Sequence, residues 1–146
     1  MALGDLYNNL GYGVLYQAAI TATTTATNYA DLDGFESVVV FATIDSDTAS
    51  AGNGITLAVW ESDLDGATPA AIASYSAVAS ADLEGAFAQV VATGTVIQCV
   101  GYKGAERYLT VKMTEEGTYS GYIHISVIGI PNRRPDTSIT VAAITS

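Results

Sequence analysis

Cationic residues are scarce in this sequence of 146 residues, and they are confined to one end of it. Five Lys and Arg stand against 15 Asp and Glu, which gives a formal net charge of −10. Residues 1–102 contain no Lys or Arg at all. A negative field of this kind repels phosphate groups, so we expect neither a nucleic-acid partner nor binding to an anionic membrane surface.

Reactive side chains are equally few, with one cysteine, Cys99, and one histidine, His124. A single cysteine excludes an intrachain disulfide, and we expect Cys99 to be a small buried hydrophobe in a strand. One histidine without a recognisable nucleophile and orienting acid does not make a catalytic site, and no nucleophile elbow, phosphate-binding loop, dinucleotide fingerprint or metal-spaced His/Cys set is present. The sequence therefore predicts a protein that is not an enzyme and needs no cofactor or metal.

A small hydrolase with an unrecognised acid pair stays open as an alternative. Its carboxylates would be Asp63 with Asp65, or Glu115 with Glu116.

Long apolar runs are also missing, although 49% of the residues are hydrophobic. No run approaches the roughly 18 residues that span a bilayer. The first residues lack the basic and apolar regions of a secretory signal, so we expect none. The apolar residues are instead spread over short segments, which indicates the core and interfaces of one domain.

These short segments alternate between apolar and other residues with the period of two that is typical of β-strands. The alternation is cleanest in residues 107–114 and 119–130, which Thr114–Gly117 joins as a hairpin turn. The run Val38–Phe41 predicts a strand buried on both faces or nearly so. The other expected strands are 14–20, 36–44, 55–61, 72–78 (weak), 86–92 and 96–102, with an extended stretch at 21–27.

About eight short strands with frequent turns predict an all-β domain, a single antiparallel β-sandwich or barrel. We expect residues 1–13 to form an N-terminal arm and residues 14–130 to form the domain. Pro131 and Pro135 cannot donate to a sheet, so the domain should end near Ile130. Residues 131–146 are then a C-terminal arm, which either folds back as an edge strand or pairs with a neighbouring subunit.

The tetrapeptide Asp-Leu-acid-Gly occurs three times, at 31–34, 63–66 and 82–85. Paired carboxylates on a short loop suit calcium, but the spacing does not fit an EF-hand. We interpret all three as turns, in which Asp accepts from backbone amides and Gly supplies a positive φ.

Nine tyrosines and the single Trp60 leave a carbohydrate-binding module open, with Trp60 as the glycan contact. Tyrosine is equally favoured at protein interfaces. The adjacent Arg133 and Arg134 suit an acidic patch on a protein partner, because the guanidinium group pairs with carboxylates through two hydrogen bonds.

The chain resembles the small β-sandwich capsid decoration, or cement, proteins of tailed bacteriophages. The resemblance is carried by Ala30–Gly66, a strand, polar loop and strand; by Gly101–Asp136, where a Gly-Tyr-Lys-Gly turn leads into two strands and a basic exit; and by the N-terminal arm. It implies a jelly-roll-like sandwich that binds the major capsid protein on the outer surface of the virion, after synthesis in the host cytoplasm, and that self-associates as a dimer or trimer. The expected capsid or subunit contacts are Leu6, Tyr7, Leu10, Tyr12, Arg133, Arg134, Ile139 and Val141.

Overall fold

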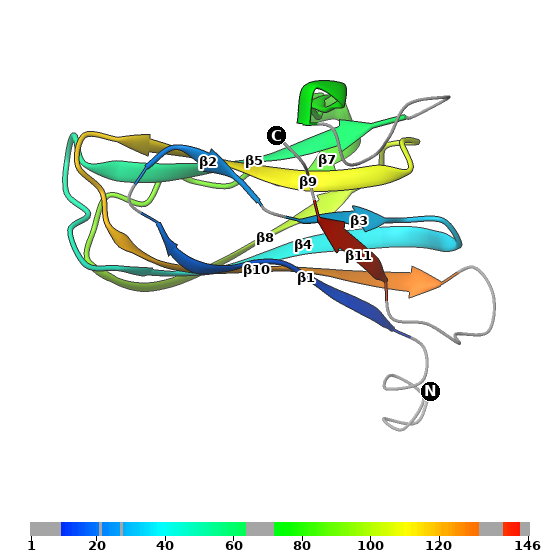
Figure 1. Ribbon diagram of the computed structural model, residues 1–146, viewed down its shortest axis with the longest axis horizontal. Helices are drawn as coiled ribbons and strands as arrows, with labels where there is room; N and C mark the ends of the chain where they lie inside the picture. The colour runs from blue at the N-terminus through cyan, green and yellow to red at the C-terminus, as the bar shows by residue number, and fades with distance from the viewer. Residues whose placement is uncertain (1–9, 21, 27, 64–71, 132–138, 144–146) are drawn as a thin grey trace.

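The computed structural model describes residues 10–20, 22–26, 28–63, 72–131 and 139–143, and it confirms an all-β sandwich. Two antiparallel sheets lie face to face, and they run along the long axis of the molecule (Figure 1). The described residues include no α-helix, only two short 3₁₀ turns at Ile72–Ser74 and Ser80–Asp82. None of the helices in these ranges is long and apolar enough to cross a membrane.

The first sheet has the strand order β1-β10-β4-β8-β7, and the second has the order β11-β3-β9-β5-β6 with β2 paired to β9. The bounds in the first sheet are β1 Gly11–Ile20, β4 Phe35–Ser46, β7 Leu83–Glu84, β8 Gly94–Tyr102 and β10 Gly121–Pro131. Those in the second are β2 Thr24–Thr25, β3 Asn28–Asp31, β5 Gly54–Ser62, β6 Ser76–Ala77, β9 Tyr108–Glu116 and β11 Thr140–Ala143.

The long strands pair in a nested order that gives the jelly-roll character. Strand β1 pairs with β10, β3 with β9 and β4 with β8, while β5 lies at the centre of this nesting. The chain thus behaves as one long hairpin that wraps around itself and places alternate strands in opposite sheets, as a jelly roll does.

The core lies between the sheets and follows from the alternation of the strands. In β10, Ile123, Ile125 and Val127 are fully buried, whereas Tyr122 and His124 point to the outside. In β4 the same period buries Val38 and Val40 but leaves Val39 and Phe41 half-exposed. The inner face of this strand is buried as expected, whereas its outer face is only partly covered within one chain.

Two expected strands between β5 and β8 are wrong. Residues 72–78 form a 3₁₀ turn and the two-residue β6. Residues 86–92 form no strand, and only Val90 bridges to Ile55. In neither segment do the large apolar residues alternate with the period of two of a strand, because Ile72, Tyr75 and Val78 are spaced by three, as are Phe87 and Val90.

The N-terminal end of the domain differs from the expectation, and the C-terminal end takes one of the two expected forms. Strand β1 begins at Gly11, inside the segment expected as an arm. At the other end, β10 ends at Pro131, and β11 folds back as the edge strand beside β3, with Val141 opposite Ala30. Ile139, just before β11, is buried in the chain's own core.

Candidate interaction surfaces

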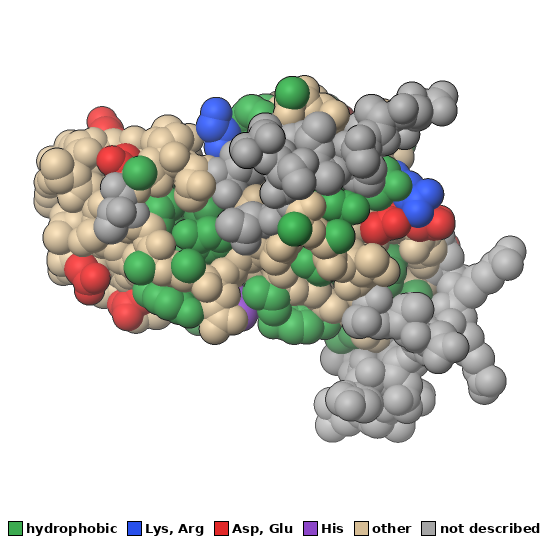
Figure 2. All heavy atoms as spheres, viewed as in Figure 1, with side chains coloured by type: hydrophobic (Ala, Val, Ile, Leu, Met, Phe, Trp, Pro, Cys, Tyr) green, Lys and Arg blue, Asp and Glu red, His purple; other side chains and the backbone are tan. Residues whose placement is uncertain are grey.

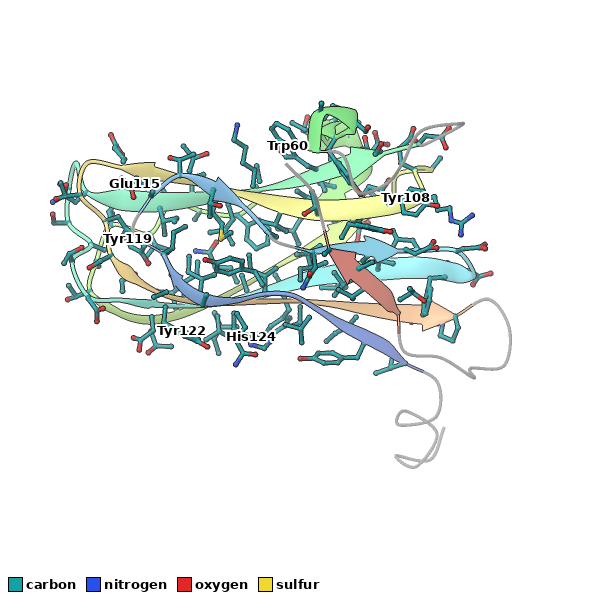
Figure 3. The ribbon with its side chains drawn as sticks, viewed as in Figure 1. Trp60, Tyr108, Glu115, Tyr119, Tyr122 and His124 are labelled. Carbon is teal, nitrogen blue, oxygen red and sulfur yellow. The ribbon has the colours of Figure 1, made fainter. Side chains whose placement is uncertain are left out.

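The outer face of the five-stranded sheet carries the largest group of exposed apolar side chains. We use "outer face" for the side chains of β1, β10, β4 and β8 that point away from the core. Figure 3 shows Tyr122 and His124 on this side of β10, away from the second sheet. The registers place the outer-face side chains in cross-strand rows: Tyr12, Ile128 and Val39; Val14, Ser126, Phe41 and Cys99; Gln17, His124, Thr43 and Ile97; Ala19, Tyr122, Asp45 and Thr95.

Most of the large apolar side chains that the described residues expose belong to this face. Tyr12, Ile97, Tyr122 and Ile130 are 46–62% exposed, and Leu10 immediately precedes β1. Only Val91, the sixth such side chain in the described ranges, lies away from these strands. A contiguous apolar patch that a chain leaves open marks an interaction surface more often than scattered single residues do.

The outer face is also almost free of charge, although the chain has a net charge of −10. Strands β1, β8 and β10 contain no Asp, Glu, Lys or Arg. Asp45 lies at one end of the face and accepts a hydrogen bond of 3.0 Å from the Thr95 hydroxyl. His124 lies 3.4 Å from the Tyr12 hydroxyl. At the lower edge of Figure 2, green apolar side chains flank the purple histidine, and red carboxylates appear toward the left end.

The outer side of the six-stranded sheet is different, because its aromatic rings are occupied by cations or by one another. The Lys112 ammonium lies 4.7 Å from the centre of the Trp60 ring. Tyr29 and Tyr108 meet edge to face with 5.6 Å between ring centres, and the Arg107 guanidinium lies 5.1 Å from the Tyr108 ring. A sugar stacking on Trp60 therefore has to displace Lys112 from the ring.

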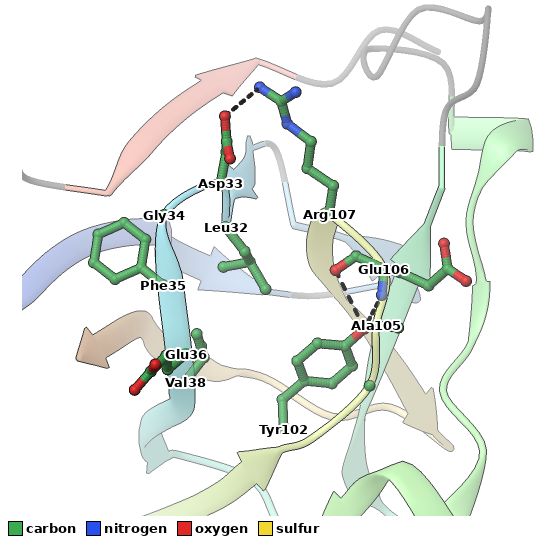
Figure 4. Close-up of a pocket in the computed structure, with 11 residues that line it drawn as sticks. Leu32, Asp33, Gly34, Phe35, Glu36, Val38, Tyr102, Ala105, Glu106 and Arg107 are labelled. Carbon is green, nitrogen blue, oxygen red and sulfur yellow. Dashed lines mark hydrogen bonds and ion pairs between the residues drawn. The ribbon is translucent and has the colours of Figure 1, made fainter. Parts of the chain in front are cut away.

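A cleft of 340 Å³ opens at one end of the sandwich, between the turn that precedes β4 and the loop between β8 and β9 (Figure 4). Its lining includes Phe35, Tyr102 and Arg107. Arg107 donates from Nε to Asp31 Oδ1 over 2.8 Å and from Nη2 to Asp31 Oδ2 over 2.7 Å. The Arg107 hydrogen bonds lower the pKa of the Asp31 carboxyl, against an opposing effect of its burial.

Tyr102 lines this cleft and is hydrogen-bonded to the residues around it. Its hydroxyl donates to Glu61 Oε2 over 2.6 Å and accepts from the Glu106 backbone N–H over 3.0 Å. Burial, followed by the hydrogen bond to Glu61, raises the pKa of the Tyr102 phenol. Burial also raises the pKa of the Glu106 carboxyl, with smaller contributions from Asp63 and Glu61. These contacts tie the loop to the sandwich.

The first Asp-Leu-acid-Gly segment is the turn that the sequence predicts. Asp31 Oδ1 accepts from the Asp33 amide over 3.0 Å, and Gly34 has a φ of +87°. Arg107 also lies 3.7 Å from Asp33 and thus occupies the position where a calcium ion would contact both carboxylates. Gly85 of the third segment has a φ of +88°, and the second segment lies mostly outside the described residues. The described residues contain no group of three or more His, Cys, Asp or Glu that could hold a metal ion.

Of the two acid pairs expected of a hydrolase, the structure describes both members of only one, Glu115 with Glu116, and their side chains point apart. Glu115 lies opposite Ile55 and Glu116 opposite Gly54, so successive positions of β9 direct the two side chains to opposite faces. Glu116 instead accepts a hydrogen bond from the Gln89 amide. Asp65 lies outside the described residues.

The structure divides the expected contact residues into three groups. Leu6, Tyr7, Arg133 and Arg134 lie outside the described residues. Ile139 is buried and Val141 packs against the core, so both are engaged within the chain. Leu10 and Tyr12 are exposed, and Tyr12 belongs to the outer face.

Sequence reasoning missed the outer face and misplaced Cys99. The thiol is exposed on this face rather than buried. The signal was present in the outward positions of the expected strands, where Tyr122, Ile97 and Phe41 stand in place of the usual charged residues. Each of these residues is unremarkable alone, and only the sheet order brings them together.

No protein-family model matches this sequence. The search of curated proteins finds no match either. Among solved structures, the chain is similar to the crystal structure of the SPBc2 prophage-derived protein YomS, at 9% sequence identity and a TM-score of 0.49, over 84% of this chain and 93% of that one. A likeness this distant carries no argument about function.

Proposed function

We propose that this chain is a non-enzymatic structural protein of a bacteriophage virion, which binds the outer surface of the capsid and stabilises it. The observation that carries the protein-binding part is the outer face, an apolar and nearly uncharged sheet surface on a strongly acidic chain. A flat surface of this kind suits contact with protein. The capsid as the target comes from the resemblance of Ala30–Gly66 and Gly101–Asp136 to decoration proteins.

The distribution of charge supports a role on a crowded surface. Asp33, Asp47 and Glu116 are examples of carboxylates that lie away from the outer face and are exposed. Negative charge facing solvent keeps particles apart, while an uncharged face permits close contact. Because a shell repeats one contact many times, modest binding of each copy adds up to a large gain in shell stability.

Co-sedimentation tests this proposal. The full chain is mixed with empty shells assembled from the major capsid protein of the same phage, and the shells are pelleted. We expect saturable binding and shells that withstand a higher temperature when decorated. Recovery of the chain in the supernatant at every ratio would refute capsid binding.

A further inference from the structure

We propose that the outer face binds the same face of a second copy of this chain, so that two five-stranded sheets pack against each other about a two-fold axis. The inference rests on the premise, shared with the proposed function, that this face binds protein. It assigns the face to a second copy, so a dimer would bind the capsid through the surfaces that stay open. A dimer would present each remaining surface twice, which strengthens the binding of a repeating shell.

The distribution of charge permits a second copy as the occupant at this face. Two chains of net charge −10 repel one another, and this repulsion is greatest where carboxylates would meet. The interior rows of the outer face contain no carboxylate. Asp45 lies at one end of β4, the exposed Glu36 lies at the irregular register at its other end, and Glu84, 3.5 Å from Lys103, lies on β7 at the border. This face lets two such chains touch without bringing unpaired carboxylates into the contact.

The face is large enough for a stable contact. Four strands spaced about 4.8 Å apart, over about nine residues of about 3.3 Å each, present roughly 600 Å². Two copies then bury roughly 1,200 Å², at the lower bound of specific protein interfaces. This extent is available because each of the four strands, β1, β4, β8 and β10, is 9–12 residues long.

The composition of the face suits packing of sheet against sheet. Phe41 and His124 lie on the two central strands, with Tyr12 and Ile97 on the strands at either side. In a two-fold arrangement, side chains near the axis meet their own symmetry mates, so an uncharged centre is required. The two inner sheets would pack about 10 Å apart, as the two sheets within a sandwich do.

Sedimentation velocity with matched variants tests the dimer. The full chain, of 15.1 kDa, is expected to sediment as a dimer at tens of micromolar. Thr43→Arg places a cation at the centre of the face and lowers the net negative charge, so a weaker dimer would reflect the charge placed in the contact and not greater repulsion between the two chains as a whole. We expect it to raise the dissociation constant by roughly tenfold or more, because an unpaired charge is costly to bury. Thr56→Arg, an equally half-exposed threonine on the opposite sheet, is the control and should leave the dimer intact.

A second variant and a change of ionic strength test whether a weaker dimer comes from the altered contact or from misfolding. Ile97→Thr alters a side chain that is 62% exposed, so the fold should persist while the dimer weakens. Raising the salt concentration should strengthen the dimer, since screening reduces repulsion between two acidic bodies. A wild-type chain that stays monomeric, forms a trimer, or responds equally to Thr43→Arg and Thr56→Arg would overturn the proposal.

Cys99 provides an independent probe, because it is exposed on the same face. Maleimide labelling of the native chain should slow as the concentration rises through the dimer range, and it should stay fast in Thr43→Arg. Labelling that does not depend on concentration would contradict the dimer. These measurements need no capsid, so a dimer that fails to bind shells refutes the proposed function alone, and a monomer that binds shells refutes the dimer alone.

Discussion

Ile139→Ala tests whether the C-terminal strand belongs to its own chain. Ile139 is 3% exposed and joins the core beside β1, so that a Cβ placed on Gly11 would lie 3.1 Å from its Cγ1 atom. Truncation of a buried Ile to Ala costs about 2–5 kcal/mol. Because Ile139 lies at the edge of the sandwich, where neighbours can relax into the space, we expect a loss of about 2–3 kcal/mol. For a domain of this size, that lowers Tm by about 6–10 °C.

Chemical denaturation at two protein concentrations provides the assay. Val141→Ala is the matched control, because Val141 is only half-buried and its truncation should cost about 1 kcal/mol. A stability of Ile139→Ala equal to that of the wild type would show that β11 does not pack as described. A loss that disappears at low protein concentration would show that the strand pairs with another subunit, the second possibility that the sequence leaves open.

Three further predictions follow from other contacts. Asp31→Asn removes the paired hydrogen bonds that the Asp31 carboxylate accepts from Arg107. Because folding lowers the pKa of Asp31, the wild type should have a larger free energy of unfolding than the variant in urea melts above about pH 4. This difference should vanish as the pH falls through the lowered pKa. Gly117→Ala, at a φ of +70° with the Asn53 side chain and the Gly52 carbonyl in the path of a Cβ, should cost about 1–3 kcal/mol in thermal melts, and more than Gly34→Ala, where the φ is +87° but the space is open. Trp60→Ala should leave glycan-array signals at background, like those of the wild type, because Lys112 occupies the ring; a wild-type signal that Trp60→Ala abolishes would instead support the carbohydrate-binding alternative.

The strands with strict alternation could be predicted from the sequence, because one face of each is packed against the core. Residues 107–114 and 119–130 closely match β9 and β10. The hairpin expected between them at Thr114–Gly117 is wrong, because β9 continues to Glu116 and the two strands lie in opposite sheets. In both strands, the buried positions are β-branched or long aliphatic residues, such as Val111 and Ile125, which fit a pleated surface. The local pattern and the tertiary environment agree here, so a short stretch of sequence is enough to predict each strand.

Residues 86–92 could not be assigned in the same way. Half of their apolar residues are alanine, which has little side chain to bury, and the larger ones, Phe87, Val90 and Val91, do not alternate with a period of two. Val90 is nevertheless buried, through a bridge to Ile55 that no local pattern contains. Likewise, the fold-back of β11 depends on a space beside β1 that two glycines, Gly11 and Gly13, leave open far away in the sequence.

The overestimated burial of β4 is informative in its own right. The run Val38–Phe41 has the composition of a strand covered on both faces, yet within one chain only Val38 and Val40 are covered. Val39 and Phe41 lie in rows with Ile128 and Cys99, which are themselves open or half-open. The composition of a strand reflects every surface that the strand buries, including a surface that another molecule covers. The apolar outward positions of β4 therefore fit the proposal that another molecule covers the outer face.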